Sequence, residues 1–228
     1  MNYFQLKQWL FFLLFTSSTF LLGQENPDAA QIRQQIKKLK VLGSVLYLAA
    51  HPDDENTRII AYMANGRLYE TAYLALTRGD GGQNLLGNEK GDLMGVIRTQ
   101  ELLEARKIDA GQQFFTNSVD FGYTRSQDET IQKWGLDSVL MDVTRIIRTF
   151  HPDVIILRFP PDERAGHGHH QASATIARMA VDYASAPMNL FENPMLSHPW
   201  IPKRVYINTR KWWVPNIDSV AAAHPEKY

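Results

Sequence analysis

The chain has 228 residues, of which 44% are hydrophobic and 21% are charged, a balance that is typical of a folded globular protein and long enough for one α/β domain. Lys and Arg together number 24, as do Asp and Glu, so the net charge gives no reason to expect nucleic acid or an anionic membrane as a partner. Cysteine is absent, which excludes disulfides and thiolate metal sites and leaves His, Asp and Glu as metal ligands.

The first residues, 1–23, predict a secretory signal peptide. One positive charge at Lys7 precedes an apolar run that is too short to span a bilayer comfortably, so we expect export and no stable membrane span after cleavage. An uncleaved membrane anchor is the alternative. Residues 24–43 read as a polar lead-in with a short amphipathic helix that ends at Gly43. The tail, residues 211–228, has no pattern that marks the end of a domain, so a further region could begin there.

Between the lead-in and the tail, apolar runs of strand length alternate with helical patterns. Continuous apolar runs are typical of strands that are covered on both faces. The sequence predicts strands at 44–50, 70–77, 112–117, 153–159 and 204–210, and helices at about 55–65, 93–111, 136–150 and 170–184. Strands separated by helices pair in parallel through right-handed crossovers. We therefore predict one Rossmann-like α/β domain over residues 44–210, doubly wound, with a mostly parallel sheet and helices on both faces.

Polar loops follow four of the predicted strands. They are HPDDE (51–55), TRGDGGQN (77–84), NSVDFGY (117–123) and PPDERAGHGHH (160–170). In open parallel sheets, ligands bind outside the carboxyl ends of the strands, so these loops should meet at one edge. A similar phrase, HPDV at 151–154, precedes a strand instead, and we expect His151 and Asp153 at the opposite edge of the sheet.

The loop after the first strand predicts a metal site. His51 and Asp54 stand three residues apart around Pro52, which fixes a tight turn, and they could grip one divalent cation with Asp53 beside them. Capping of the following helix is the alternative, although one aspartate would suffice for that. A third ligand could come from a histidine cluster downstream: His167, His169 and His170. Two histidines, one carboxylate and an open position form a hydrolytic zinc site, in which the metal lowers the pKa of water to about 7 and a spare carboxylate acts as general base.

Four phrases of the sequence, AAHPDDE, LTRGDGGQN, RTQELLEA and GHGHHQAS, occur in this order within about residues 44–185. In this order they resemble the PIG-L or LmbE-like family of zinc-dependent N-acetylglucosaminyl deacetylases. The resemblance implies that zinc is bound by His51, Asp54 and His170. It also implies that Asp53 is the base that activates water and that His167 stabilises the oxyanion. Contacts to sugar hydroxyls are implied for Arg98, Glu101 and Asp120.

The chain departs from the His-x-Asp-His pattern of that family, because His169 stands where Asp is common. We expect His169 to be a solvated or hydrogen-bonded loop histidine rather than a direct ligand. As a whole, the sequence predicts an exported zinc hydrolase that removes acetyl from an N-acetylglucosamine-type amino sugar. Because this ligand set also suits Fe²⁺, one alternative is an iron(II) oxygenase. The other is a non-catalytic glycan-binding domain with a structural metal.

Overall fold

The computed structural model of the chain describes residues 27–82, 84–187, 193, 196, 198–211 and 213–225, so the predicted signal peptide lies outside the described residues. The chain divides into two units, residues 1–40 and residues 41–228. The described part of the first unit holds the helix α2 (Ala29–Lys38), which begins where the Asp28 side chain accepts a hydrogen bond from the backbone N–H of Gln31. No helix among the described residues is both long enough and apolar enough to cross a bilayer.

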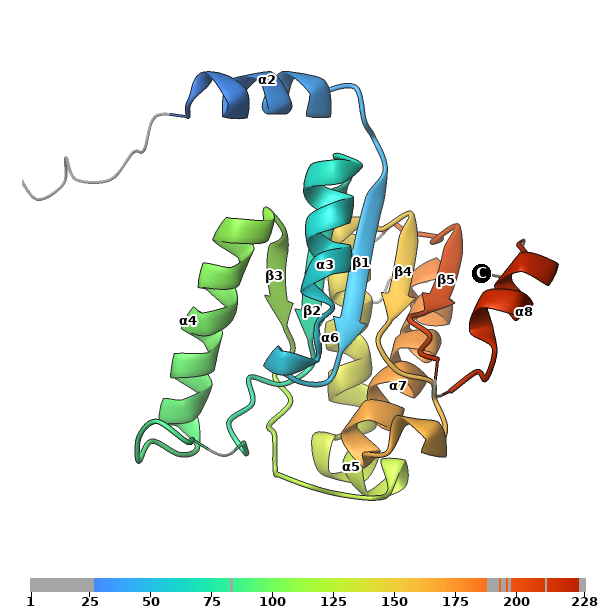
Figure 1. Cartoon of the computed structure of the whole chain (residues 1–228). Coiled ribbons are helices and arrows are strands. Elements are labelled where there is room, and N and C mark those ends of the chain that lie inside the picture. The colour runs from blue at the N-terminus through green and yellow to red at the C-terminus, as the bar shows by residue number, and fades with distance from the viewer. Residues whose placement is uncertain are drawn as a thin grey trace, which may run out of the picture. The chain divides into compact units, whose positions relative to one another are not determined.

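The second unit is built on one five-stranded parallel sheet. Its strands are β1 (Ser44–Ala49), β2 (Glu70–Ala75), β3 (Gln112–Phe115), β4 (Val154–Leu157) and β5 (Arg204–Ile207). They lie in the order β3-β2-β1-β4-β5, and the arrows of Figure 1 all point the same way. This confirms the predicted Rossmann-like sheet. The strand order reverses between β1 and β4, which is the point where sheets of this kind bind ligands.

Helices cover both faces of the sheet, as predicted (Figure 1). Leu46 and Leu48 of β1 pack into a core with α6 (Leu136–Phe150) and α7 (Gly168–Ser185) on one face. The alternate β1 residues, among them Tyr47, pack on the other face against α3 (Thr57–Ala61) and α4 (Asp92–Asp109). Successive side chains of a strand point to opposite faces, so burial of every β1 residue requires a helical layer on each side.

The structure differs from the sequence prediction after β1. A 3₁₀ turn, η2 (Pro52–Asp54), comes first, and the helix predicted over about 55–65 runs from Thr57 to Gly66, as α3 continued by the π turn η3 (Tyr62–Gly66). The helix begins at Thr57 because the Asn56 side chain accepts a hydrogen bond from the backbone N–H of Ile59 and caps it. Two further helices were not predicted: α5 (Gln127–Trp134) and, in the tail, α8 (Ile217–Ala223).

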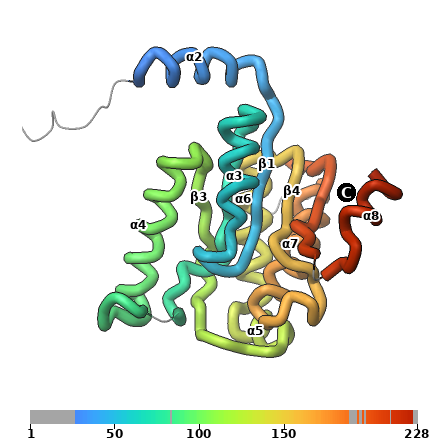
Figure 2. The backbone as a smooth tube through the Cα atoms, in the orientation of Figure 1, coloured from blue at the N-terminus to red at the C-terminus, as the bar shows by residue number. Residues whose placement is uncertain are grey.

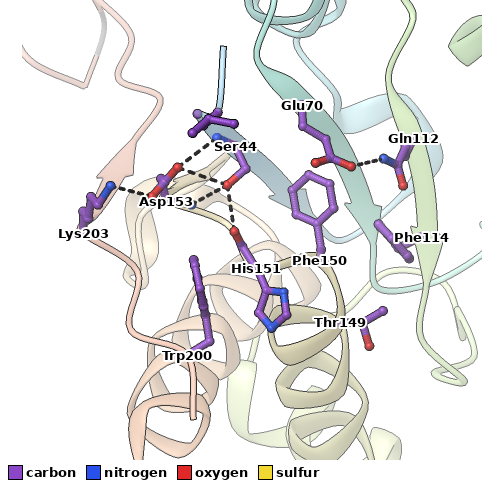
Figure 3. Close-up of a pocket in the computed structure, with 12 residues that line it drawn as sticks. Ser44, Glu70, Gln112, Phe114, Thr149, Phe150, His151, Asp153, Trp200 and Lys203 are labelled. Carbon is purple, nitrogen blue, oxygen red and sulfur yellow. Dashed lines mark hydrogen bonds and ion pairs between the residues drawn. The ribbon is translucent and has the colours of Figure 1, made fainter. Parts of the chain in front are cut away.

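The amino edge of the sheet is occupied by the HPDV phrase, which confirms its predicted position. His151 ends α6 in the left-handed conformation, and Asp153 accepts hydrogen bonds from the backbone N–H and hydroxyl of Ser44 at the start of β1. A cavity of about 600 Å³ lies here (Figure 3). Its acidic side chains have partners within the lining: Asp153 pairs with Lys203 at 2.8 Å, and Glu70 accepts a hydrogen bond from the side chain of Gln112.

Candidate metal centre

The candidate site lies at the other edge of the sheet, where the carboxyl ends of β1 and β4 meet. His51 begins η2 directly after β1, and His170 lies in the first turn of α7, which follows the loop after β4. The tube in Figure 2 shows both segments at this carboxyl edge. The backbone of His51 is held in place by the Tyr73 hydroxyl, which donates a hydrogen bond to the His51 carbonyl oxygen.

His51, Asp54 and His170 come together as the sequence predicts. His51 Nδ1 lies 3.1 Å from Asp54 Oδ2, and His170 Nε2 lies 3.4 Å from Asp54 Oδ1. One donor atom from each of the three residues lies within 4.8 Å of the other two. Ligands of a tetrahedral zinc ion with bonds of about 2.0–2.1 Å are about 3.3 Å apart, so this group fits the coordination sphere of one metal ion.

A second group of possible ligands, His51, His167 and His169, also meets the 4.8 Å spacing. In this group His51 Nε2 lies 2.9 Å from His169 Nδ1, which is the distance of a hydrogen bond and shorter than the ligand spacing around zinc. The group also has no carboxylate to balance the charge of a cation. The geometry therefore favours the group with Asp54.

The ring of His170 is fixed in a metal-binding orientation. Its Nδ1 lies 3.1 Å from the carbonyl oxygen of Ala165, which can only accept, so Nδ1 carries a proton and Nε2, which faces Asp54, is the nitrogen available to a metal. The ring also stacks on Phe159, with centroids 3.8 Å apart and an interplanar angle of 5°. A backbone carbonyl is a common partner for the second nitrogen of a metal-bound histidine.

Asp54 is a buried carboxylate between two imidazoles, with only 11% of its side chain exposed. Burial alone would raise the pKa of Asp54, but the hydrogen bonds to His170 and His51 outweigh it and hold the pKa well below its ordinary value. Burial alone would likewise lower the pKa of His51, and the Asp54 carboxylate raises it above the ordinary value. Asp54 is therefore ionised at neutral pH and available to a cation.

Asp53 has a different environment, since 65% of its side chain is exposed. The Arg98 guanidinium lies 3.5 Å from its carboxylate and also 3.3 Å from the carboxylate of Glu101. Gly79, with φ of 69°, allows this arrangement, because a Cβ there would come within 2.9 Å of the Arg98 side chain and 3.1 Å of Pro52. The predicted roles of Asp53 as base and of Arg98 and Glu101 as sugar contacts remain predictions.

His167 caps the start of α7 with its side chain. Its Nδ1 accepts a hydrogen bond from the backbone N–H of His169, so its proton is on Nε2. Burial, together with the neighbouring His170 and His51, lowers the pKa of His167 to about 4. The ring centroid lies 5.4 Å from that of His51. His167 is therefore a neutral hydrogen-bond donor beside the metal group at neutral pH, and its predicted oxyanion role stays a prediction.

His169 is fully buried and hydrogen-bonded to His51, in the first turn of α7 rather than in a loop. Burial, with neighbouring histidines, lowers the pKa of His169 to about 3. Asp120, predicted to contact sugar, is also buried; one of its oxygens accepts a hydrogen bond from the backbone N–H of Gly122 and lies 3.7 Å from His169 Nδ1. It thus faces the buried histidine, and its sugar contact remains a prediction.

The sequence analysis missed several residues that support the histidines: Tyr73, Phe121, Trp134 and Phe159. Tyr73 could have been noticed in the sequence, because a tyrosine in a buried parallel strand needs a hydrogen-bond partner for its hydroxyl. The aromatic rings carried none, since aromatic residues near strand ends are ordinary core residues.

Together the fold and the site define an α/β protein with a group of two histidines and one aspartate, suited to a metal ion, at the switch point of a parallel sheet. The family model described as PIG-L, GlcNAc-PI de-N-acetylase, matches residues 46–181, which is more than half of the chain. The chain therefore belongs to the PIG-L family. No curated protein sequence matches it.

Two solved structures share the fold. The N,N'-diacetylchitobiose deacetylase from Pyrococcus horikoshii is 18% identical with a TM-score of 0.55, over 90% of this chain and 82% of that one. The conserved protein TT1542 from Thermus thermophilus is 22% identical with a TM-score of 0.50, over 73% of this chain and 66% of that one. The chain thus spans slightly less than two thirds of the Thermus protein, and at these identities the likeness shows the fold.

Proposed function

We propose that this chain is a metal-dependent N-deacetylase that hydrolyses the acetamide of an N-acetylglucosamine-type amino sugar, with Zn²⁺ as the metal. The observation that carries the proposal is the convergence of His51, Asp54 and His170, with a second carboxylate at Asp53. Membership of the PIG-L family supports the reaction. The name of the Pyrococcus structure supports an acetylated amino sugar as the substrate class. The pattern of residues 1–23 supports export to the periplasm or outside the cell.

Amide hydrolysis needs a base and a hydrogen-bond donor to the oxyanion, and Asp53 and His167 are the groups proposed for these roles. A divalent cation held by His51, Asp54 and His170 would polarise the acetyl carbonyl and lower the pKa of a nearby water. Asp53 accepts the proton of the attacking water and passes it to the leaving nitrogen, and the Arg98 guanidinium keeps its carboxylate oriented. His167 donates a hydrogen bond from Nε2–H to the carbonyl oxygen as negative charge develops there. Acetate and a free amine leave.

The two alternative functions that the sequence allows do not use all of these side chains. An iron(II) oxygenase would use the same three ligands but has no need of a base at Asp53 or of a neutral donor at His167. A glycan-binding domain with a structural metal needs neither. The placement of both groups around one metal position favours hydrolysis.

The test is a screen of N-acetylated sugars for acetate release by the full chain, with and without a chelator. We expect release from at least one N-acetylglucosamine derivative, its loss with the chelator, and its return when Zn²⁺ is added back. Asp53→Asn should abolish release while the protein still binds Zn²⁺. Product formation that requires dioxygen would support the oxygenase, and an Asp53→Asn protein that keeps full sugar affinity, with no turnover by either form, would support the binding domain.

A further inference from the structure

Both ring nitrogens of His51 have polar partners. Nδ1 faces Asp54 Oδ2 at 3.1 Å, and Nε2 lies 2.9 Å from Nδ1 of His169. A histidine binds a metal through the lone pair of one nitrogen, so the other nitrogen carries the proton and needs an acceptor. In the metal-free protein Nδ1 of His51 donates to Asp54, but a metal bound between them takes the Nδ1 lone pair. The proton of His51 is then on Nε2, and the atom facing it is Nδ1 of His169.

The two metal-binding histidines differ in the kind of acceptor that fixes them. His170 donates from Nδ1 to the carbonyl oxygen of Ala165, which can never donate in return. The partner of His51 is an imidazole, which can accept at Nδ1 only when its own proton is on Nε2. The tautomer of His169 therefore decides which nitrogen of His51 is free for a metal.

The surroundings of His169 enclose its ring. The side chain is fully buried, with the rings of Phe121 and Trp134 centred 4.4 Å and 4.9 Å away. Its Nε2 is buried with no hydrogen-bond partner among the described residues. Buried polar atoms are nearly always paired, and an unpaired one lowers the stability of the fold. A phenylalanine would fill the same space among these aromatic rings without that loss. The only hydrogen bond described for its ring is the one to His51.

We propose that His169 is a positioning residue, whose Nδ1 accepts the Nε2 proton of His51 and thereby presents Nδ1 of His51 to the metal. The inference rests on the metal site of the proposed function and adds a residue to it. A carboxylate is the commoner partner of a metal-bound histidine. A neutral imidazole gives the same orientation without adding a further negative charge to a site that already holds Asp53, Asp54 and, 3.7 Å from Nδ1 of His169, the Asp120 carboxylate.

The test compares three substitutions at position 169 in the full chain. His169→Phe keeps an aromatic ring in the same space and removes the acceptor. His169→Asn places its carbonyl oxygen near the former position of Nδ1 and keeps the acceptor, and His169→Asp supplies a carboxylate acceptor. The measurement is the affinity for Zn²⁺ alone, by competition with a chromophoric chelator, with thermal melting of the metal-free proteins as the control for folding.

We expect His169→Phe to bind Zn²⁺ about 10- to 100-fold more weakly than the wild type, as is usual when such a partner is lost, and His169→Asn and His169→Asp to stay close to the wild type. Unchanged affinity in His169→Phe would overturn the inference. Equal loss in all three folded variants would overturn it too, because only packing would then matter. If His169→Phe does not fold, the Asn and Asp variants decide the matter, since the inference requires both to bind Zn²⁺ normally.

Acetate release is measured in parallel, so that the two proposals can fail separately. A wild type that releases no acetate but shows the contrast between His169→Phe and His169→Asn in Zn²⁺ affinity supports the role of His169 and removes the proposed reaction. A wild type that does not bind Zn²⁺ overturns both.

Discussion

Asp53 and Asp54 are neighbours in the sequence, yet their side chains lie in opposite environments. Asp54 is buried between the rings of His51 and His170, whereas most of the Asp53 side chain is exposed and faces the Arg98 guanidinium. The 3₁₀ turn that starts at Pro52 produces this difference, because consecutive residues of such a turn point in directions about 120° apart. One carboxylate is thus buried between two histidines and the other is open to water.

This separation predicts different losses for the two conservative substitutions. Asp53→Asn should lower kcat by about 10²- to 10⁴-fold, the usual contribution of a general base, with Zn²⁺ affinity close to the wild type. Asp54→Asn should lower the affinity for Zn²⁺ by more than about 100-fold, because it removes a ligand rather than a supporting contact. Steady-state kinetics and chelator competition on both variants measure the two effects.

Glu101→Gln is the matched control for Asp53→Asn. It removes a negative charge from the other carboxylate that pairs with Arg98. Because Glu101 is itself a predicted sugar contact, we expect its loss to raise KM, and kcat at saturating substrate should change far less than in Asp53→Asn if Asp53 is the base. Equal losses in the two variants would mean that charge near Arg98, and not proton transfer by Asp53, limits the rate.

A third prediction concerns His167, which both caps α7 and points its Nε2 into the site. Asparagine is a good helix cap, and its side-chain oxygen can accept the backbone N–H of His169 as Nδ1 does now, but it has no group in place of Nε2. His167→Asn should therefore keep the melting temperature and the Zn²⁺ affinity and lower kcat by about 10²- to 10³-fold, as for loss of an oxyanion donor. Near-normal kcat in a folded His167→Asn protein would remove His167 from the mechanism.

The parts of the fold that the sequence predicted well are those with a strong local pattern. The helix over 136–150 has an uninterrupted apolar stripe, and the structure has α6 over the same residues. In contrast, α5 has eight residues and buries only Thr130 and Trp134, so no stripe marks it. The exact start of the helix after β1 depends on one side-chain cap at Asn56, which a pattern of apolar residues does not reveal.

The candidate site likewise has a part that the sequence could predict and a part that it could not. His51, Asp54 and His170 could be predicted because each follows a strand at the edge where loops converge, and because the resemblance assigns them. The hydrogen bond between His51 and His169 could not, since it joins residues 118 positions apart and depends on how the first turn of α7 packs beside β1. Burial of His169 likewise follows from Phe121 and Trp134, which belong to other segments of the chain.

The far end of α7 gives a prediction about stability. Arg148 of α6 is fully buried, and its guanidinium donates hydrogen bonds to the backbone carbonyls of Tyr183, Ala184, Ala186 and Leu196. The last carbonyls of a helix have no partners within it, and a cation is favourable there. Arg148→Met should lower the free energy of unfolding by about 2–5 kcal/mol, because several buried carbonyls lose their donors. Urea unfolding measures this free energy. As a control, Arg145→Met, on the exposed side of α6, should lower the free energy of unfolding by less than about 1 kcal/mol.

The amino edge of the sheet gives a prediction about pH. The Lys203 ammonium, together with the hydrogen bonds from Ser44, holds the pKa of Asp153 below its ordinary value. A carboxylate whose pKa is lowered by folding stabilises the folded state above the unfolded pKa of about 3.9, and this contribution is lost as the pH falls through the lower folded value. Asp153→Asn should therefore be about 1–2 kcal/mol less stable than the wild type at pH 7, an amount expected for charge-assisted hydrogen bonds near the surface.

The difference between Asp153→Asn and the wild type should begin to shrink once the pH falls below about 4, where the unfolded wild type takes up a proton, and should be lost only when the pH falls below the lower folded pKa of Asp153. Urea unfolding of both proteins between pH 3 and pH 7 would show it, at the pH values where both remain folded without denaturant. Lys203→Met separates the ion pair from the Ser44 contacts, since it removes only the ammonium and should cost less than Asp153→Asn. A stability difference that stays constant from pH 7 to pH 3 would mean that Asp153 acts through its shape and not through its charge.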